Sequence, residues 1–306
     1  MHEELDVESY CEWGVDYLKL DACSGRGYSD HNTSWIKFRA AIDACSKRRG
    51  FPMVLSVESC DDPDGCGLWI GDLANLWRTC GDIQATFASV MRNVAENTKM
   101  AKWAGPSGGP LNGGHWNDAG PCQHSLVCGC LLLYATDRCS LPDSRSFLSA
   151  TGADMLQVGD IGLSITEQYS HFALWSMMAS PLLMGTDVSM LSNTSLTILG
   201  NVEVTAINQD KLGIQGVPIA SQLADPTSAS CWTKPLADGS TAVILLNTGD
   251  DPASITCELA DLNVKGPPTA VRDLWAKGKF DGTVAGGKIS AKLESHAHRF
   301  VTITTK

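Results

Sequence analysis

Gly14-Val-Asp-Tyr-Leu-Lys-Leu-Asp-Ala-Cys23 is the stretch of sequence that indicates the fold, because it has the pattern of a buried strand ending in a charge. Side chains alternate between the two faces of a strand, so Lys19 and Asp21 share one face, opposite the neighbouring leucines. An apolar outer face suits a parallel strand under helices, and an inner lysine and carboxylate suit a site at the C-terminal mouth of a (β/α) barrel. The alternative is a surface ion pair on an ordinary sheet, although buried charges are rare unless paired or functional.

The pattern of strand, charged end, loop and helix then recurs along the chain. Glu58 closes a second predicted strand, and Arg78 and Asp82 close a third. Helices are predicted over 34–49 and 87–102, where apolar residues recur at helical spacing. This alternation indicates a parallel sheet or barrel rather than a sandwich.

The hydrophobic pattern of the sequence changes after about Gly216, from helical spacing to short alternating runs. Before it, further helices are predicted over 166–179 and 197–208. After it, short alternating runs separated by turn signals predict an antiparallel β domain, most simply a sandwich. These runs cover 229–234, 241–247, 253–259, 269–274, 288–293 and 299–304. The predicted organisation is a barrel-type domain over 1–215 and an antiparallel β domain over 216–306.

Composition narrows the classes of partner. The 306 residues are 43% hydrophobic and 19% charged, with a formal net charge of -11. Phosphate binding needs concentrated Lys and Arg, so nucleic acid is not expected as a partner. No apolar run reaches membrane-spanning length, so no membrane partner is expected, and the first residues lack the pattern of a signal peptide.

The twelve cysteines form no zinc motif, because no pair has the required spacing with a histidine pair at ligand distance. We therefore expect no metal and no other cofactor. The even count and the sequons at Asn32 and Asn193 favour an oxidising, secretory origin, which disagrees with the missing signal peptide. Cys231 and Cys257 either bridge the β domain or remain two buried thiols.

Two carboxylates at the mouth of one barrel, flanked by a lysine, an arginine and a further glutamate, suit glycoside hydrolysis. Retaining hydrolysis needs one ionised carboxylate to attack the anomeric carbon and a protonated one about 5 to 5.5 Å away to act as acid and then base. Polar barrel mouths serve many reactions, so this constellation alone leaves the chemistry open.

Six ordered segments carry a more specific signal, a resemblance to glycoside hydrolase family 27. They are Glu-Trp-Gly-Val-Asp-Tyr-Leu-Lys-Leu-Asp-Ala-Cys (12–23), Trp-Arg-Thr-Cys-Gly-Asp-Ile (77–83), Gly-His-Trp-Asn-Asp (114–118), Ala-Asp-Met-Leu-Gln-Val-Gly (153–159), Ala-Leu-Trp-Ser-Met-Met-Ala-Ser-Pro-Leu-Leu-Met (173–184) and Ala-Ile-Asn-Gln-Asp (206–210). That family contains the eukaryotic α-galactosidases (melibiases) and the α-N-acetylgalactosaminidases. The resemblance implies a (β/α)8 barrel followed by an antiparallel β domain.

The resemblance also implies roles for individual residues. Asp21 matches the family's nucleophile, and Asp82 matches its general acid/base. Lys19 and Arg78 match contacts to sugar hydroxyls, and Asp154 matches the acid of the family's Trp-Asn-Asp-Pro-Asp-Met motif.

Glu58 matches a glutamate that meets the sugar's 2-hydroxyl in α-galactosidases, where N-acetylgalactosaminidases carry a smaller residue. This favours galactose over its N-acetyl derivative. In the family, Cys23 is bridged to a cysteine just before that glutamate, but here Val57 stands there and Cys60 lies two residues after it. The bridge then needs a shifted loop or another partner.

Two departures from the family are expected to matter. Family members carry three further barrel strands before this stretch, with Trp-Asn-Ser-Trp and Asp-Asp-Cys-Trp motifs whose aspartates hold the galactose 4- and 6-hydroxyls. If Met1 is the true start, five of eight strands remain and those contacts are lost. In addition, residues 119–152 interrupt a family motif, and we expect a translated intron or a misassembled gene, with a lineage-specific loop as the alternative.

We therefore expect a retaining glycoside hydrolase that releases terminal α-galactose from oligosaccharides or glycoconjugates by double displacement, impaired by the truncation. A non-catalytic fragment or carbohydrate-binding remnant is the alternative from another class, and an α-N-acetylgalactosaminidase is the alternative among enzymes. The expected partner is a galactose-containing saccharide, and homo-oligomerisation stays open. The family implies a secreted, vacuolar or lysosomal location.

Overall fold

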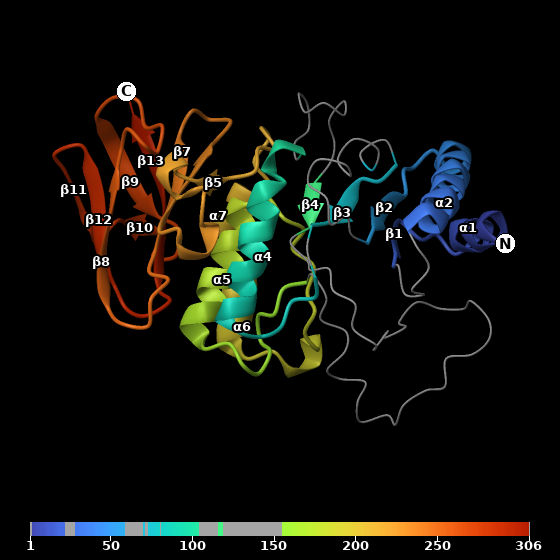
Figure 1. Cartoon of the computed structure of the whole chain (residues 1–306), viewed down its shortest axis with the longest axis horizontal. Helices are drawn as coiled ribbons and strands as arrows, with labels where there is room; N and C mark the ends of the chain where they lie inside the picture. The colour runs from blue at the N-terminus through green and yellow to red at the C-terminus, as the bar shows by residue number, and fades with distance from the viewer. Residues whose placement is uncertain are drawn as a thin grey trace.

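The computed structural model describes residues 2–21, 28–58, 70, 73–79, 81–103, 116–118 and 155–305. It contains a parallel sheet with helices and two antiparallel sheets (Figure 1). This arrangement confirms the expected fold class, a (β/α) barrel-type part followed by a β-sandwich. No helix in the described ranges is long and apolar enough to cross a membrane.

Four parallel strands form the first sheet, in the order in which they occur along the chain. They are β1 (Tyr17–Leu20), β2 (Val54–Val57), β3 (Leu76–Arg78) and β4 (Trp116–Asp118). The register pairs Leu20 with Val57, and Val57 with Trp77. The carboxyl ends of β1, β2 and β3 therefore lie at one edge of the sheet.

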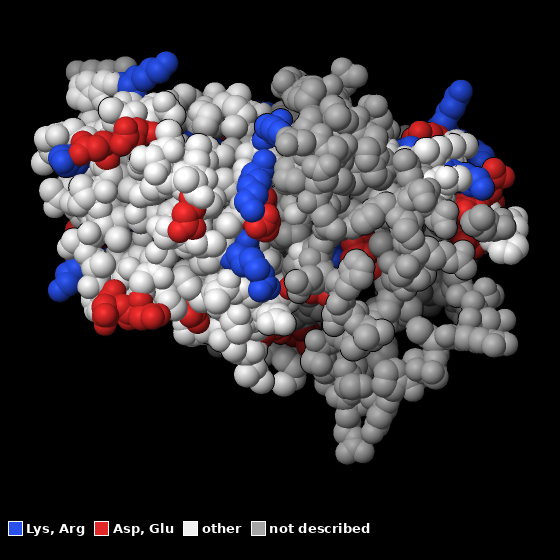
Figure 2. Space-filling view, in the orientation of Figure 1, with Lys and Arg blue, Asp and Glu red and all other residues white. Residues whose placement is uncertain are grey.

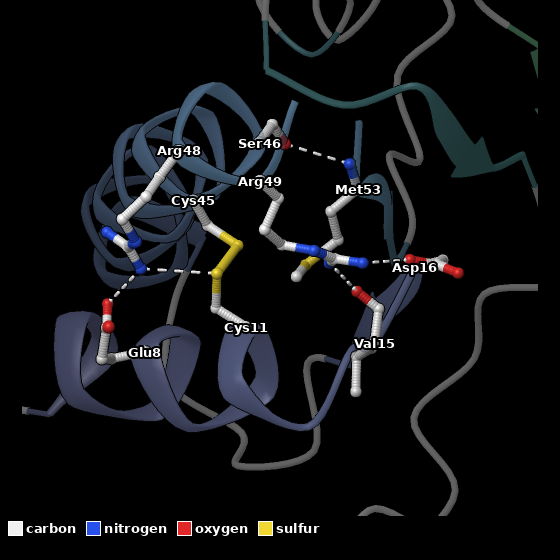
Figure 3. The surroundings of a disulfide bond; sticks show 9 residues. All are labelled: Glu8, Cys11, Val15, Asp16, Cys45, Ser46, Arg48, Arg49 and Met53. Atoms are coloured by element: carbon white, nitrogen blue, oxygen red, sulfur yellow. Dashed lines mark hydrogen bonds and ion pairs between the residues drawn. A yellow bond between two sulfur atoms is a disulfide. The ribbon is translucent and has the colours of Figure 1, made fainter. Parts of the chain in front are cut away.

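Helices α1 (Glu3–Glu12) and α2 (Tyr28–Arg49) pack together beside β1, and a disulfide between Cys11 and Cys45 joins them (Figure 3). Arg49, at the end of α2, donates to the carbonyl of Val15 at 2.7 Å and pairs with Asp16 at 2.6 Å. The end of α2 is thereby tied to the start of β1. Helix α2 begins six residues before the predicted start at 34, because polar residues in a first turn carry no apolar periodicity.

The next helices begin at clear capping residues. Thr86 accepts from the backbone N–H of Ser89 and starts α4 (Phe87–Lys99). Ser164 and Glu167 form a reciprocal capping box that starts α5 (Ile165–Met177). The short 3-10 helices are η1 (Ala101–Trp103), η2 (Val188–Met190), η3 (Ala220–Gln222) and η4 (Pro226–Ser228).

The single helix predicted over 197–208 is wrong, because two helices occupy this region. They are α6 (Asn193–Leu199) and α7 (Val202–Asn208). The Asn201 side chain accepts from the backbone N–H groups of Glu203 at 3.0 Å and Val204 at 3.2 Å. An asparagine in this position starts a new helix, so the chain turns between Gly200 and Asn201 although the apolar pattern continues.

The β domain is a sandwich of two antiparallel sheets. The larger has the strand order β10-β9-β13-β7-β6-β5, and the smaller has the order β11-β12-β8. Their bounds are β5 (Val217–Pro218), β6 (Cys231–Pro235), β7 (Thr241–Leu246), β8 (Ala253–Glu258), β9 (Pro268–Asp273), β10 (Gly278–Lys279), β11 (Thr283–Ala285), β12 (Lys288–Leu293) and β13 (His298–Thr305). Each of the six predicted runs overlaps one of these strands, and the short β5, β10 and β11 were not predicted.

Cys231 on β6 and Cys257 on β8 form a disulfide between the two sheets. The bridge is therefore the correct alternative to two buried thiols. Around it lies an apolar core that includes Val243, Ile289 and Val301, all completely buried.

A second core joins the sandwich to the helices. Phe172 and Trp175 on α5 belong to the same buried cluster as Trp232 on β6 and Ile244 on β7. Buried Lys234 donates from Nζ to the carbonyl of Ile207, near the C-terminus of α7, at 2.7 Å. Cations suit the C-terminus of a helix, so this contact fixes the helical layer against β6.

Candidate active site

The described candidate site residues lie at the carboxyl edge of the parallel sheet. Asp21 directly follows β1, Glu58 directly follows β2, and Arg78 ends β3. The Glu58 N–H donates to the carbonyl of Leu20 at 2.8 Å, which extends the ladder by one step beyond β2. The strand pairing therefore brings together three residues that are as many as 57 positions apart in the sequence.

Arg78 organises this edge through two ion pairs. Its Nη1 donates to Oε1 of Glu58 at 3.2 Å, and its Nη2 donates to Oδ1 of Asp82 at 2.8 Å. The Arg78 side chain is only 1% exposed, whereas that of Glu58 is 20% exposed and that of Asp82 is 63% exposed. A buried guanidinium with two carboxylates on its fork is held rigidly, and it places both acids at the solvent boundary.

Lys19 and Asp21 lie on the neighbouring strand. Lys19 is half-buried, and Asp21, two residues further on, is exposed at the end of β1. Leu18 is buried in the apolar core beside α1 and α2, and Leu20 packs against that core. The alternation predicted for this strand, with apolar residues on one face and charged residues on the other, is present.

Asp154 lies outside the described residues, as do Cys23, Cys60 and the whole segment 119–152. The structure therefore brings together Glu58, Arg78 and Asp82 in one ion-pair group next to the end of β1. Within the described ranges, no group of three or more His, Cys, Asp or Glu side chains is arranged to hold a metal ion.

Asn75 is a supporting residue that the sequence pattern did not reveal. Its Oδ1 accepts from the Leu55 N–H at 3.0 Å and from Arg39 Nη1 at 3.4 Å. Its own N–H donates to the Leu55 carbonyl at 2.8 Å. Asn75 thus fixes the start of β3 against β2, three residues before Arg78.

The buried side chain of Asn97 supports the chain directly after β3. Asn97 on α4 accepts at Oδ1 from Thr79 Oγ1 at 3.1 Å, and it donates from Nδ2 to Ser180 Oγ at 3.4 Å. Its backbone carbonyl accepts from Gln215 Nε2 at 3.1 Å. Because Thr79 directly follows Arg78, this network links the site to α4 and to the chain beyond α5. A polar residue on the buried face of a predicted helix was the available signal for Asn97.

Comparison with known proteins supplies the family. The family model described as Alpha galactosidase A matches residues 1–138 and 148–210, and the Alpha galactosidase C-terminal beta sandwich domain matches 227–303. This chain belongs to the alpha-galactosidase (melibiase) family. The match to the first model passes over 139–147, and the larger insertion expected over 119–152 stays a prediction.

Two plant alpha-galactosidases are similar to this chain, and the chain covers only part of the length of each. It is 32% identical over 305 residues to an alpha-galactosidase of Oryza sativa subsp. japonica, covering 99% of this chain and 60% of the relative. It is 31% identical to an alpha-galactosidase of Cyamopsis tetragonoloba, covering 100% of this chain and 62% of the relative. The chain therefore spans about 60% of the length of these relatives.

Solved structures of the family show the same fold. Alpha-galactosidase I from Mortierella vinacea matches with a TM-score of 0.75 at 24% identity, over 100% of this chain and 72% of that one. A GH27 β-L-arabinopyranosidase from Geobacillus stearothermophilus matches with a TM-score of 0.73 at 22% identity, over 99% of this chain and 61% of that one. Proteins named for different sugars thus share this architecture.

Proposed function

We propose that the protein releases terminal α-galactose from galactose-containing saccharides by retaining hydrolysis. The observation that carries this proposal is the fork of Arg78, which holds Glu58 and Asp82 beside the strand end that bears Asp21. Relatives named alpha-galactosidase support the substrate class, and one similar solved structure is a yeast alpha-galactosidase with raffinose.

In the proposed first step, the ionised carboxylate of Asp21 attacks the anomeric carbon. Asp82 gives its proton to the leaving glycosidic oxygen as the bond to the sugar breaks. In the second step, Asp82 takes a proton from water, and the resulting hydroxide displaces Asp21 from the anomeric carbon. Galactose leaves with its original configuration, and both carboxyl groups return to their starting states.

The ion pair between Asp82 and Arg78 affects the first step, in which Asp82 is the proposed acid. Pairing at 2.8 Å uses the ionised form of Asp82, which is the form that the second step needs. To act as an acid first, Asp82 has to release Arg78 and take up a proton. Its side chain is 63% exposed, so it has room to turn towards a bound saccharide.

Glu58, Lys19, Arg78 and Asp154 are the proposed contacts to the sugar hydroxyls. Glu58 is the proposed specificity residue, because a carboxylate accepts a hydrogen bond from a 2-hydroxyl but leaves no space for an N-acetyl group there. Arg78 holds this carboxylate in place, since its Nη1 donates to Oε1 at 3.2 Å.

Hydrolysis of an aryl α-galactoside tests the proposal. We expect release of the aryl alcohol by the wild-type protein, and loss of that release in Asp21→Ala and Asp82→Ala. Asp43→Ala is a matched control, because Asp43 is an exposed carboxylate on α2 that pairs only with its helix neighbour Arg39 among the contacts found. A folded wild-type chain that hydrolyses nothing contradicts the proposal.

The rival function, from another class, is a non-catalytic, carbohydrate-binding remnant. Binding of galactose without hydrolysis by the folded wild-type chain supports this rival. The second alternative is α-N-acetylgalactosaminidase specificity. Faster hydrolysis of an aryl α-N-acetylgalactosaminide than of the galactoside supports that alternative and excludes the proposed role of Glu58.

A further inference from the structure

A cavity of about 340 Å³ opens where α5 meets the β domain. Its wall includes Tyr169 from α5, and Trp275, Lys279, Asp281 and Arg299 from the turn and strands around β9, β10 and β13. We call it the junction cavity. Figure 1 places these strands on the opposite side of the helices from β1, β2 and β3, so the cavity is separate from the candidate active site.

Two aromatic side chains give the junction cavity a rigid apolar wall. Tyr169 and Trp275 meet edge to face, with ring centroids 4.6 Å apart and an interplanar angle of 76°. The indole Nε1 of Trp275 donates to Nε2 of buried His298 at 2.7 Å. Oδ1 of Asp273 accepts from the backbone N–H groups of Trp275 at 2.9 Å and Ala276 at 2.8 Å. The indole and its turn are therefore fixed before any ligand arrives.

The charges around the junction cavity balance. Asp281 accepts two hydrogen bonds from Arg299, each of 3.0 Å, and Asp273 lies 4.0 Å from the same guanidinium. Lys279 is exposed at the rim. Two cations and two carboxylates give no net charge, and acidic and basic groups also lie interspersed over the described part of the face in Figure 2. A neutral ligand suits this balance better than an anion.

We propose that the junction cavity is a second, non-catalytic saccharide site that takes one neutral hexose unit. The C–H face of a hexose packs on aromatic carbon, while its hydroxyl groups both donate to carboxylates and accept from ammonium and guanidinium groups. A volume of about 340 Å³ lies at the lower end of the range of roughly 300–1,000 Å³ for small-ligand sites. The site goes beyond the proposed hydrolysis and does not depend on it.

Fluorine NMR of the whole protein labelled with 5-fluorotryptophan tests the proposal. Trp275→Phe assigns the Trp275 resonance among the nine tryptophans of the chain. We expect D-galactose or D-glucose at millimolar concentrations to shift this resonance in the wild-type protein. Lys279→Ala should weaken the interaction roughly tenfold, the effect of losing one hydrogen bond to a charged group. Lys292→Ala, which removes an exposed lysine of the same domain outside the cavity, should leave the affinity unchanged.

Three outcomes overturn the proposal. They are no shift with either neutral sugar, equal affinity in the wild-type protein and Lys279→Ala, and a response to D-glucuronate alone, which indicates an anion site. The Trp275 response is measured again in Asp21→Ala. A retained response with lost hydrolysis supports both proposals, whereas a response in a chain that never hydrolyses galactosides contradicts only the proposed enzyme.

Discussion

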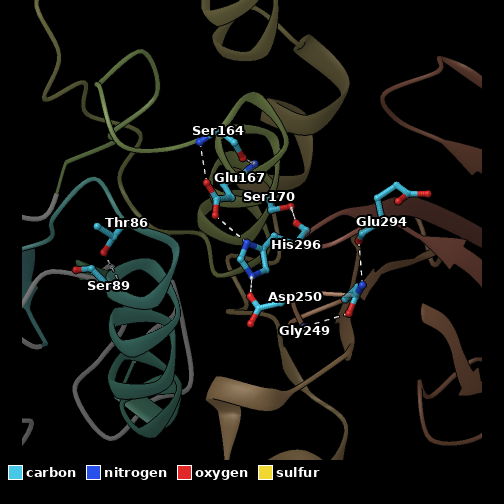
Figure 4. Close-up of polar contacts among 10 residues, drawn as sticks. Thr86, Ser89, Ser164, Glu167, Ser170, Gly249, Asp250, Glu294 and His296 are labelled. Atoms are coloured by element: carbon cyan, nitrogen blue, oxygen red, sulfur yellow. Dashed lines mark hydrogen bonds and ion pairs between the residues drawn. The ribbon is translucent and has the colours of Figure 1, made fainter. Parts of the chain in front are cut away.

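Oε1 of Glu167 lies 2.7 Å from Nδ1 of His296, and this contact joins the first turn of α5 to the turn between β12 and β13 (Figure 4). The imidazole also stacks on Phe87 of α4, with centroids 4.0 Å apart, and its Nε2 lies 3.3 Å from Oδ1 of exposed Asp250. His296 adopts a positive φ of 56°, a conformation that non-glycine residues rarely take. One side chain thus connects both helices to the sandwich.

Glu167 makes this junction sensitive to acid. Burial alone raises the pKa of its carboxyl, but hydrogen bonds from Ser164 and His296 outweigh burial, so the pKa is lowered below 4.5 in the folded protein. A lowered folded pKa contributes stability above about pH 4.5 that is lost as the pH falls through the folded value. We expect Glu167→Gln to lose less stability than the wild-type protein between pH 5 and pH 3 in urea unfolding. Glu258→Gln, which removes a surface partner of Lys288, is the control and should follow the wild type.

Two buried histidines add a separate acid dependence at higher pH. Burial lowers the pKa of His171 and of His298 from 6.5 to about 3, and Arg299 adds to the shift of His298. The unfolded chain therefore takes up protons below about pH 6.5 that the folded chain refuses, so stability falls as the pH drops from there towards 3. Each histidine contributes up to about 1.4 kcal/mol per pH unit. His298→Gln should reduce the measured slope between pH 6 and pH 4 by up to that amount, and an unchanged slope contradicts the assignment.

The disulfide Cys231–Cys257 should stabilise the sandwich. It closes a sequence separation of 26 residues and joins opposite sheets. Chain-entropy arithmetic for such a loop gives roughly 3.5 kcal/mol. The double variant Cys231→Ala, Cys257→Ala should lose a free energy of unfolding of that order in urea. A loss below about 1 kcal/mol would show that the unfolded chain is not constrained by the bridge.

Asn201 should stabilise the fold as a helix cap and as a contact to the β domain. Besides its capping contacts, its Nδ2 donates to the carbonyl of Leu274 at 3.1 Å. Asn201→Ala loses the capping contacts and the hydrogen bond to Leu274. We expect its free energy of unfolding, measured in urea, to fall by about 1–2 kcal/mol. Asn201→Asp keeps the cap acceptor and loses only the donor, so it should cost less. Equal costs for the two variants would contradict a capping role.

The charged strand ends could be predicted from local sequence because alternation along one strand fixes which side chains share a face. Lys19 and Asp21 were placed together in this way, whereas Asp82 lies beyond the end of β3 and meets Arg78 through an ion pair. The ion pair between Arg78 and Glu58 could not be predicted from local sequence, because it depends on the register between separate strands. Family resemblance supplied the roles of these residues, which no local pattern contains.

The remaining differences have equally physical causes. Cys11–Cys45 was not predicted, because spacing does not say which of twelve cysteines meet when helices pack. The break between α6 and α7 was missed because apolar periodicity runs through it, and Asn201 acts through backbone N–H groups that periodicity does not record. Asn75 supports the site from just before β3, where a short polar residue has no distinctive spacing.

Arg78→Lys tests whether the geometry of the fork, rather than its charge, is what the candidate site needs. Lysine keeps the positive charge, but a single ammonium cannot reach Glu58 and Asp82 in the two directions that Nη1 and Nη2 occupy. We expect the protein to stay folded and hydrolysis of an aryl α-galactoside to fall about 100-fold or more, because a misplacement of roughly 1 Å has that effect. Arg92→Lys is the matched control, since Arg92 is exposed and donates only to Ser89 among the contacts found. If Arg78→Lys and Arg92→Lys retain the same activity, the fork does not position the acids.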